Sequence, residues 1–323
     1  MSDQPLSATT VLNAELDELL ADSRGAAPAQ GRAAVLGSPI DHSLSPVLHG
    51  AAYDSLGLTE WSFSKVAVGG EGEPTLAEHL ASLREGAGLG AEADAAGAAP
   101  WRGFAVTMPL KEDAVALATV VTERAYRLGA ANTLLAVPGG WAADNTDTVG
   151  VREALREVGV GSAPRVVLLG SGATARSALG ALSVLGAEHV TFAVRSAVRP
   201  ESEALARELG MAIEVVSLGD AEVLTDAIAR ADATVSALPH GTSLHLPDVE
   251  PGRLHRAVLL DVVYGGWPSP LASWASAGGA TVLSGLPMLL HQAVEQVRLM
   301  TGQVPDVAAM RAALQAHTGP AGW

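Results

Sequence analysis

Hydrophobic and polar positions divide much of the chain into short apolar runs that alternate with helical patterns. The clearest run is Arg165–Leu169, which Pro164 leads in and whose length and β-branching are typical of a strand buried on both faces. From Thr174 onward, apolar residues recur with a helical period until Gly186, where a left-handed cap is expected. This stretch therefore predicts a strand, a glycine-containing turn and a helix in succession.

The alternation continues towards the C-terminus. Helical patterns at 201–210 and 221–231 separate further runs of strand length. Those runs lie at 190–194, 213–216, 233–237, 258–263 and 281–283. A last long helix is expected from Gly285 to Met300, stopped by Gly302. Strands and helices in this order predict a right-handed, doubly wound parallel sheet.

The N-terminal half is patterned less regularly. Strands are expected at 32–37, 61–68, 101–108 and 133–135, and helices at 46–56, 122–128 and 147–158. Ser45 is expected to cap the first of these helices, and 138–140 to form a hairpin turn. Residues 1–30 contain one acidic amphipathic stretch and are expected to form a mobile tail. Residues 86–100 are rich in Ala and Gly and are expected to form a surface insertion.

Composition narrows the class of protein. A length of 323 residues with 48% hydrophobic content favours a globular protein of two domains. No apolar run approaches the ~18 residues of a membrane span, and the first residues lack the basic start of a signal peptide, so we expect a cytoplasmic location. The absence of cysteine excludes disulfides and Cys-ligated zinc. A net charge of −15 argues against nucleic acid or a membrane as the main partner.

The turn after the strand at 165–169 has the outline of a dinucleotide site. Gly170 and Gly172 allow a tight turn and close approach of the backbone to a diphosphate, and Ala175 stands at the third small position of the G-x-G-x-x-G/A pattern. The competing interpretation is a turn whose small residues serve packing alone. After the next strand come Arg195, Ser196 and Arg199, with no carboxylate. Guanidinium groups suit a 2′-phosphate and so favour NADP over NAD, although a solvated loop is the alternative.

Other candidate residues are ambiguous one by one. Only two of the 20 basic residues are lysines. Lys111 stands near the start of a helix and is a candidate for chemistry that needs an ammonium able to lose its proton, the alternative being an ordinary exposed helix lysine. Lys65 is expected to be a surface residue. Ser43 and Ser45 lie at a strand-to-helix corner and suit either turn bonding and capping or a small polar ligand. Asp147 suits a helix N-terminus, where the helix dipole stabilises its carboxylate, and this role is the alternative to a catalytic one.

Taken together, these segments resemble the shikimate dehydrogenase family from Ala34 to Gly302. The matching motifs are G-S-P-I-D-H-S-L-S-P at 37–46, V-T-M-P-L-K at 106–111, A-N-T at 131–133, N-T-D-T-V-G at 145–150, D-V-V-Y at 261–264 and the segment 285–292. The resemblance implies NADPH-dependent reduction of 3-dehydroshikimate to shikimate, on the chorismate route to aromatic amino acids. It also implies an N-terminal α/β substrate domain (31–146), a Rossmann-type NADP-binding domain (147–285), a helical segment (286–323) that returns to the substrate domain, and an active site in the cleft between the domains.

The resemblance also supplies residue roles. Lys111 and Asp147 would form the catalytic pair that moves a proton at the C3 oxygen of the ring. The substrate would be held by Ser43, Ser45, Thr107, Asn132, Tyr264 and Gln292. The cofactor would be held by Gly170, Ser171, Gly172, Ala173, Thr174, Arg195, Ser196, Arg199, Glu123, Val262 and Gly285.

Three positions depart from the family pattern. Ala105 and Val194 stand where the family usually has Asn, and Ala173 replaces a glycine of the turn. The first departure could alter support of the pocket, and the change at Val194 could weaken NADP binding or relax the preference for it.

Two other functions stay open at this point. A quinate or quinate/shikimate dehydrogenase would share the architecture, but is expected to carry a bulkier or lost hydroxyl at the serine pair and an acidic residue near Arg195. A non-catalytic ligand-binding regulator of the same fold would not need Lys111 and Asp147. No metal is expected, because His42 and His49 lack a carboxylate cluster with ligand spacing. The expected partner is a small-molecule substrate, bound by a monomer or homodimer.

Overall fold

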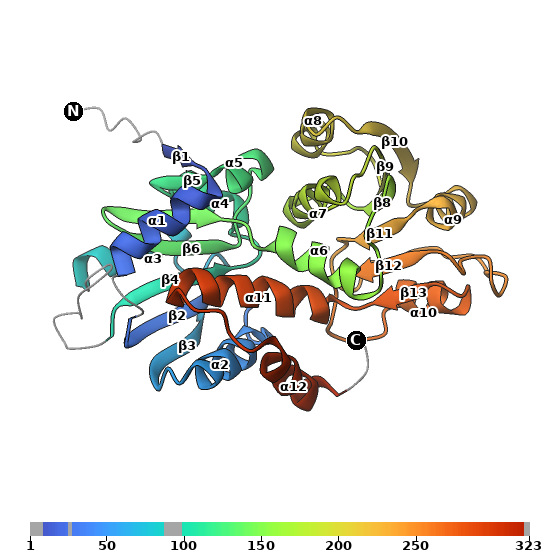
Figure 1. Ribbon diagram of the computed structural model, residues 1–323. Coiled ribbons are helices and arrows are strands. Elements are labelled where there is room, and N and C mark those ends of the chain that lie inside the picture. The colour runs from blue at the N-terminus through green and yellow to red at the C-terminus, as the bar shows by residue number, and fades with distance from the viewer. Residues whose placement is uncertain (1–8, 25–27, 87–98, 320–323) are drawn as a thin grey trace. The chain divides into compact units, whose positions relative to one another are not determined.

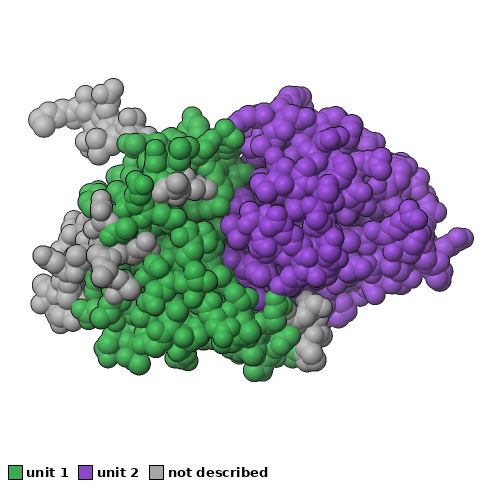
Figure 2. Space-filling model, viewed as in Figure 1, with its two compact units in different colours: residues 1–146, 293–319 green, residues 147–292, 320–323 purple. Residues whose placement is uncertain are grey.

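The computed structural model of the protein describes residues 9–24, 28–86 and 99–319 (Figure 1). These residues divide into two compact units, which Figure 2 shows in different colours. Unit 1 comprises the described residues up to Thr146 together with Ala293–Gly319, and unit 2 comprises Asp147–Gln292. Helix α11 (Gly285–Thr301) contributes residues to both.

Unit 1 is built on a mixed sheet of seven strands within the described residues, in the order β1-β5-β7-β6-β4-β2-β3. Strand β6 runs antiparallel to β4 and β7, and the other neighbours are parallel. The strands are β1 (Thr9–Val11), β2 (Gln30–Gly37), β3 (Glu60–Ala67), β4 (Trp101–Val106), β5 (Val120–Thr122), β6 (Thr133–Val137) and β7 (Gly140–Asp144). The helices that lie wholly in this unit are α1 (Asn13–Arg24), α2 (Ser45–Leu56), α3 (Leu76–Gly86), α4 (Lys111–Leu117), α5 (Glu123–Leu128) and α12 (Val307–Thr318).

The core of unit 1 forms around the central strands. Phe104 of β4 and Trp141 of β7 are buried, with ring centroids 5.0 Å apart. Aromatic pairs at this spacing add to the stabilisation that comes from removing their apolar surface from water. The predicted hairpin is confirmed, since β6 and β7 pair antiparallel across the turn at 138–139.

The structure corrects the N-terminal prediction. Part of the segment expected to be a mobile tail forms β1, which pairs in parallel with β5, and α1. Leu16 and Leu20 of α1 are buried, and Asp17 accepts from Arg298 of α11 at 2.9 Å. The apolar face of the acidic stretch therefore packs on the domain. Most of the insertion expected at 86–100 lies outside the described residues.

Unit 2 has a parallel sheet of six strands among its described residues, in the order β10-β9-β8-β11-β12-β13. Its strands are β8 (Arg165–Leu169), β9 (His189–Val194), β10 (Ala212–Ser217), β11 (Ala233–Ser236), β12 (Val258–Asp261) and β13 (Thr281–Leu283). Its helices are α6 (Asp147–Glu157), α7 (Ala173–Val184), α8 (Pro200–Glu208), α9 (Ala221–Arg230) and α10 (Pro270–Ala277). Helices α6, α7 and α8 cover one face of the sheet, and α9 and α10 cover the other (Figure 1).

This strand order confirms the doubly wound prediction. The order reverses between β8 and β11, and ligands of such sheets bind at that point, beyond the carboxyl ends of the strands. The glycine turn at 170–172 follows β8 directly, and the loop that starts at Ala237 follows β11. One prediction was incomplete, because the helix expected to be the last long one is followed by α12, which packs on α2.

Candidate functional site

The carboxyl ends of β2 and β4 lie side by side in unit 1. The Thr107 amide donates to the Leu36 carbonyl at 2.9 Å, and the Ser38 amide donates to the Met108 carbonyl at 3.0 Å. A Cβ on Gly37 would lie only 2.4 Å from Cγ2 of Thr107, so this close approach requires glycine. The loop that carries the serine pair and the segment that carries Thr107 therefore leave the sheet at the same edge.

The serine corner differs from its prediction in one respect. Ser45 is the first residue of α2, and Leu44 takes the N-cap position without a side-chain hydrogen bond, so the expected capping by Ser45 is wrong. Ser45 lies one position inside the helix, and its amide donates to Oγ of Ser43 at 3.3 Å. Gly57 closes the helix in the left-handed conformation, as predicted. The Ser45 hydroxyl is thus not used for capping.

Asn132 is buried beside this edge. Its carbonyl accepts from the Val106 amide at 2.7 Å, which places it at the end of β4. Its side-chain Oδ1 accepts from the Thr146 amide at 2.7 Å, and Nδ2 donates to the Thr146 hydroxyl at 3.0 Å. Asn132 therefore fixes the residue that directly precedes Asp147.

A buried chain of polar side chains supports Asn132. Nε2 of Gln296 donates to the Asn132 carbonyl at 3.0 Å and to the Thr133 hydroxyl at 3.1 Å. Oε1 of Gln296 lies 3.4 Å from Nε2 of His49, and Nδ1 of His49 lies 3.4 Å from the Tyr53 hydroxyl. Since the amide oxygen can only accept, the imidazole carries its proton on Nε2 and accepts from Tyr53.

Burial keeps His49 neutral. It lowers the pKa of this imidazole to about 3, although the hydrogen bond to Gln296 opposes the shift. The ring also stacks on Phe63, with centroids 3.8 Å apart. Sequence reasoning did not find this arrangement around Gln296, although Gln296 stands one helical turn after the predicted site residue Gln292.

Lys111 is confirmed as the start of a helix. It is the first residue of α4 and half-buried, and its carbonyl accepts from the Ala131 amide at 2.8 Å, next to Asn132. The other lysine, Lys65, is exposed on β3, and its ammonium donates to the Asp41 carbonyl. Asp147 is buried and begins α6, as predicted.

The glycine turn of unit 2 has the geometry expected of a phosphate site. Gly170 has φ of 98°, a conformation that favours glycine, and its amide donates to the Ala193 carbonyl at 2.9 Å. Gly172 takes the N-cap position of α7 and provides no side-chain cap. The first N–H groups of the helix, at Ala173 and Thr174, therefore have no intrahelical or capping acceptor and suit a negatively charged group.

The turn is joined to the arginine loop. Oγ of Ser171 accepts from the Arg199 amide at 3.1 Å, and the Ser171 carbonyl accepts from the Ser202 hydroxyl at 2.7 Å. Arg195 and Ser196 follow the end of β9 and are exposed. Within the described residues, the Arg195 guanidinium has no hydrogen bond or ion pair, so it is available to an anionic ligand.

A second group of candidates lies after β12. A Cβ on Gly285 would lie 2.1 Å from the Val262 carbonyl oxygen, so this approach also requires glycine. Burial raises the pKa of the Tyr264 phenol. Gln292 uses Nε2 to donate to the Leu289 carbonyl at 2.9 Å. Glu123 differs from the other cofactor candidates, because it lies in unit 1, on α5, where it pairs with Arg127 at 2.7 Å.

The loops after β11 and β12 line a cavity of about 330 Å³. Its walls include His240, Asp261 and Ser269. Burial raises the pKa of the Asp261 carboxyl. The hydrogen bond that Ser269 donates to this carboxyl at 2.6 Å acts in the opposite direction, and burial has the larger effect. Polar groups therefore gather at the carboxyl edge of the sheet, where the sequence predicted a ligand.

The doubly wound sheet, the glycine turn and Arg195, whose guanidinium has no partner among the described residues, define an α/β protein with a nucleotide-binding unit, an architecture that NADP-dependent oxidoreductases use. Comparison with known proteins gives the family. Residues 35–134 match the model of the shikimate dehydrogenase substrate binding domain, and residues 285–315 match that of the shikimate 5′-dehydrogenase C-terminal domain. The chain is 36% identical to the shikimate dehydrogenase (NADP(+)) of Halobacterium salinarum, over 88% of this chain and 98% of the relative. The chain belongs to the shikimate dehydrogenase family, which confirms the resemblance seen in the sequence.

Solved structures agree with this assignment. The shikimate dehydrogenase of Mycobacterium tuberculosis matches with a TM-score of 0.71 and 38% identity, over 88% of this chain and 99% of that chain. The Thermus thermophilus enzyme, solved in complex with NADP(H) and shikimate, matches with a TM-score of 0.69 and 33% identity, over 88% of this chain and 98% of that chain. The two-domain α/β fold is therefore shared with enzymes of this family.

Proposed function

We propose that the protein catalyses the reversible NADP-dependent reduction of 3-dehydroshikimate to shikimate. The observation that carries the proposal is the gathering of predicted substrate and catalytic residues at one edge of the unit 1 sheet. These residues are Ser43, Ser45, Thr107, Lys111 and Asn132. They offer hydroxyl, amide and ammonium groups, the donors that a carboxylated and hydroxylated ring requires.

Each of these residues is assigned a role that matches the chemistry of its side chain. The Ser43 and Ser45 hydroxyls donate to the ring carboxylate, and Thr107 and Asn132, together with Tyr264 and Gln292, hold the ring hydroxyls. In the reductive direction, Nζ of Lys111 gives a proton to the C3 oxygen, and in the oxidative direction it takes that proton back. Asp147 fixes the orientation and protonation of Lys111. The bound nicotinamide supplies or accepts the hydride.

The fit of NADP rests on two features of unit 2. The uncapped start of α7 and the glycine turn suit the diphosphate. The unpaired guanidinium of Arg195, beside Ser196 and Arg199, suits the 2′-phosphate, since arginine offers a fork of donors to phosphate oxygens. Val262 and Gly285 would contact the nicotinamide end, and Glu123 would contribute from α5.

Two alternatives are disfavoured by particular residues. A quinate-preferring enzyme would not be expected to keep both Ser43 and Ser45, or to lack a carboxylate near Arg195. A binding regulator would not need Lys111 with Asp147.

The described residues contain no helix long and apolar enough to cross a membrane. A cytoplasmic location and a monomeric or homodimeric state remain part of the proposal.

Steady-state kinetics of the two lysine variants test the catalytic part. Lys111→Met is expected to lower kcat for shikimate oxidation by about 100-fold or more, because the proton transfer loses its positioned group. Lys65→Met, which removes the protein's other lysine, is expected to change kcat by less than about twofold. If Lys111→Met kept most of its turnover with a native circular dichroism spectrum, Lys111 would not carry the proton.

A further inference from the structure

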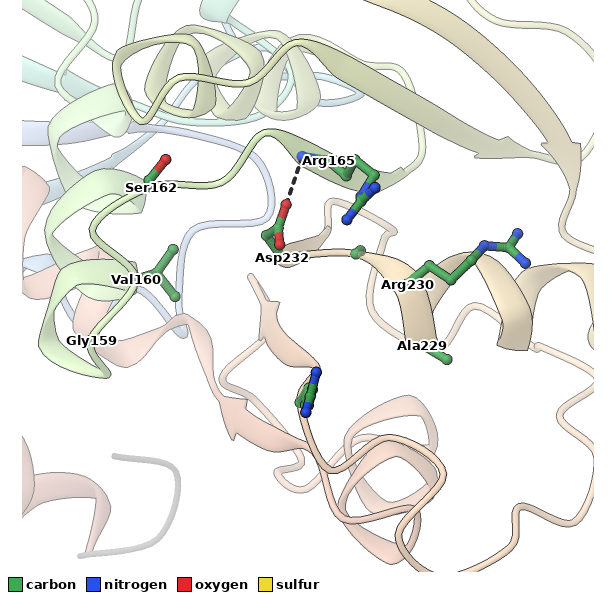
Figure 3. A pocket seen from close by; sticks show the side chains of 9 residues that line it. Gly159, Val160, Ser162, Arg165, Ala229, Arg230 and Asp232 are labelled. Atoms are coloured by element: carbon green, nitrogen blue, oxygen red, sulfur yellow. Dashed lines mark hydrogen bonds between the residues drawn. The ribbon is translucent and has the colours of Figure 1, made fainter.

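A cavity of about 670 Å³ lies at the edge of the six-stranded sheet opposite the glycine turn. Figure 3 shows it between the loop after α6, the start of β8 and the end of α9. Arg165 is the first residue of β8, and the turn follows the last one, so about 16 Å of strand separates Arg165 from Gly170. The cavity is therefore distinct from the proposed cofactor site.

The charged residues that line the cavity are mainly cationic. They are Arg165, Arg230, Arg256 and a single acid, Asp232, which together carry two net positive charges in a protein with a net charge of −15. Oδ2 of Asp232 accepts from the backbone amide of Arg165 at 2.8 Å, so it ties the end of α9 to β8 (Figure 3). A cationic hollow in an acidic protein attracts anions of small size.

The arginines that line this cavity differ from most other arginines of the described residues in their interactions. Most of the other arginines with described side chains bind a carboxylate, a carbonyl or an aromatic ring. Among the described residues, the guanidiniums of Arg165, Arg230 and Arg256 bind none of these. Within the part of the chain that the structure describes, Arg195, at the proposed 2′-phosphate site, also binds none of these. Among the described residues, three guanidiniums without such a partner thus surround one cavity and repeat the feature on which the proposed 2′-phosphate site rests.

Structural roles account for only part of this arrangement. Arg230 is in the last turn of α9, where its charge offsets the negative end of the helix dipole. Arg165 begins a strand and Arg256 lies in the loop before β12, so neither has a helix end of its own to offset. The C-terminal ends of α6 and α9 carry partial negative charge and would repel an anion. The three full positive charges of the arginines exceed these partial charges in magnitude.

We propose that this cavity is a binding site for a small anion with two or more negative charges, of the carboxylate or phosphate type. The guanidinium forks accept either geometry in bidentate form. Such a ligand would join β8, α9 and the loop before β12, and so would stabilise the nucleotide-binding unit from the side away from its cofactor. The site would be an effector site and not a part of catalysis.

Isothermal titration calorimetry of the whole chain tests this proposal. Citrate and inorganic phosphate serve as probes in separate titrations, with ionic strength held constant by sodium chloride. The pocket variant is Arg165→Gln/Arg256→Gln. The matched control is Arg127→Gln/Arg207→Gln, which removes the same charge from two exposed arginines that lie outside the cavity. Arg195→Gln reports on binding at the cofactor site instead.

The proposal predicts saturable binding of at least one probe, weakened about tenfold or more in the pocket variant. The control and Arg195→Gln should leave the dissociation constant within about twofold. Whichever probe binds identifies the ligand as a carboxylate or a phosphate. An equal loss in the control, a loss confined to Arg195→Gln, or no binding of either probe at constant ionic strength would each overturn the proposal.

Discussion

The ion pair between Arg124 and Asp144 offers the sharpest test of the physical reasoning. Asp144 ends β7, its side chain is 1% exposed, and it is three residues before Asp147. Nε of Arg124 donates to Oδ1 at 3.1 Å, its Nη2 donates to Oδ2, and the Thr122 hydroxyl donates to Oδ1 at 2.7 Å. Burial raises the pKa of Asp144, but the Arg124 charge and these hydrogen bonds outweigh it and hold the pKa below its usual value.

Arg124→Met should expose the cost of this buried charge. Removing one partner of a buried ion pair costs about 3–5 kcal/mol, because the other charge stays buried. The Arg124 side chain is 21% exposed and two hydrogen bonds to Asp144 remain, so we expect about 3 kcal/mol at pH 7. Arg127→Met on the same helix is the control. Its pair with Glu123 is 51% and 41% exposed, so its loss should cost about 0.5 kcal/mol or less.

The pH dependence of the loss has a definite sign. In the native protein the folded pKa of Asp144 is lowered, so its stabilisation is present above the unfolded value near 3.8 and disappears as the pH falls through the folded pKa. Without Arg124, burial raises the folded pKa above the unfolded value. The neutral acid then stabilises the fold at low pH, and this contribution disappears as the pH rises through the raised pKa.

Urea unfolding at pH 7 and pH 5 measures both effects. The difference in unfolding free energy between the native protein and Arg124→Met should shrink at pH 5, while the difference for Arg127→Met should change little. A loss below 1 kcal/mol at pH 7, or a loss that grows towards pH 5, would refute the account of a buried charge that needs its partner.

Three further substitutions, and Gly172→Ala as a control for the last of them, probe the candidate site. Arg195→Gln should raise KM for NADP⁺ about tenfold or more and leave KM for NAD⁺ nearly unchanged, as initial rates at varied cofactor would show. Gln296→Met should cost about 1–3 kcal/mol in urea unfolding and raise KM for shikimate, because it orphans the His49 N–H and releases Asn132; an unchanged KM would limit Gln296 to stability. Gly285→Ala should cost about 3 kcal/mol or more, since its Cβ would meet a carbonyl oxygen at 2.1 Å, whereas Gly172→Ala, with nothing within 4 Å, should cost under about 1 kcal/mol.

Local patterns predicted unit 2 well. The run at 165–169, the turn at 170–172 and the following helix were all correct, because a strand buried on both faces and an amphipathic helix each carry their periodicity in the sequence. The position of the arginine loop directly after β9 was also predicted correctly, and its role in holding NADP stays a prediction. The hydrogen bond from this loop to Ser171 was not predicted, since that contact joins residues 28 positions apart.

The features that the sequence did not predict depend mainly on contacts between residues far apart in the chain. Strand β1 has three residues and is defined by its pairing with β5, more than 100 residues later, so no local pattern could show it. Ser45 was expected to cap α2 because Pro46 suits the first helical position, yet the helix begins one residue earlier and Leu44 takes the cap position. The buried link from His49 to Gln296 joins side chains 247 residues apart, and only the fold brings them together.

The central claim is that Ser43, Ser45 and Arg195 set substrate and cofactor preference while Lys111 and Asp147 carry the proton step. The most direct measurement follows nicotinamide absorbance with shikimate or quinate, each paired with NADP⁺ or NAD⁺, at matched concentrations. The account predicts that kcat/KM is highest for shikimate with NADP⁺ and lower for every other pair. Preference for quinate with NAD⁺ would contradict both specificity assignments, and cofactor binding without turnover of either acid would contradict the assignment as an enzyme.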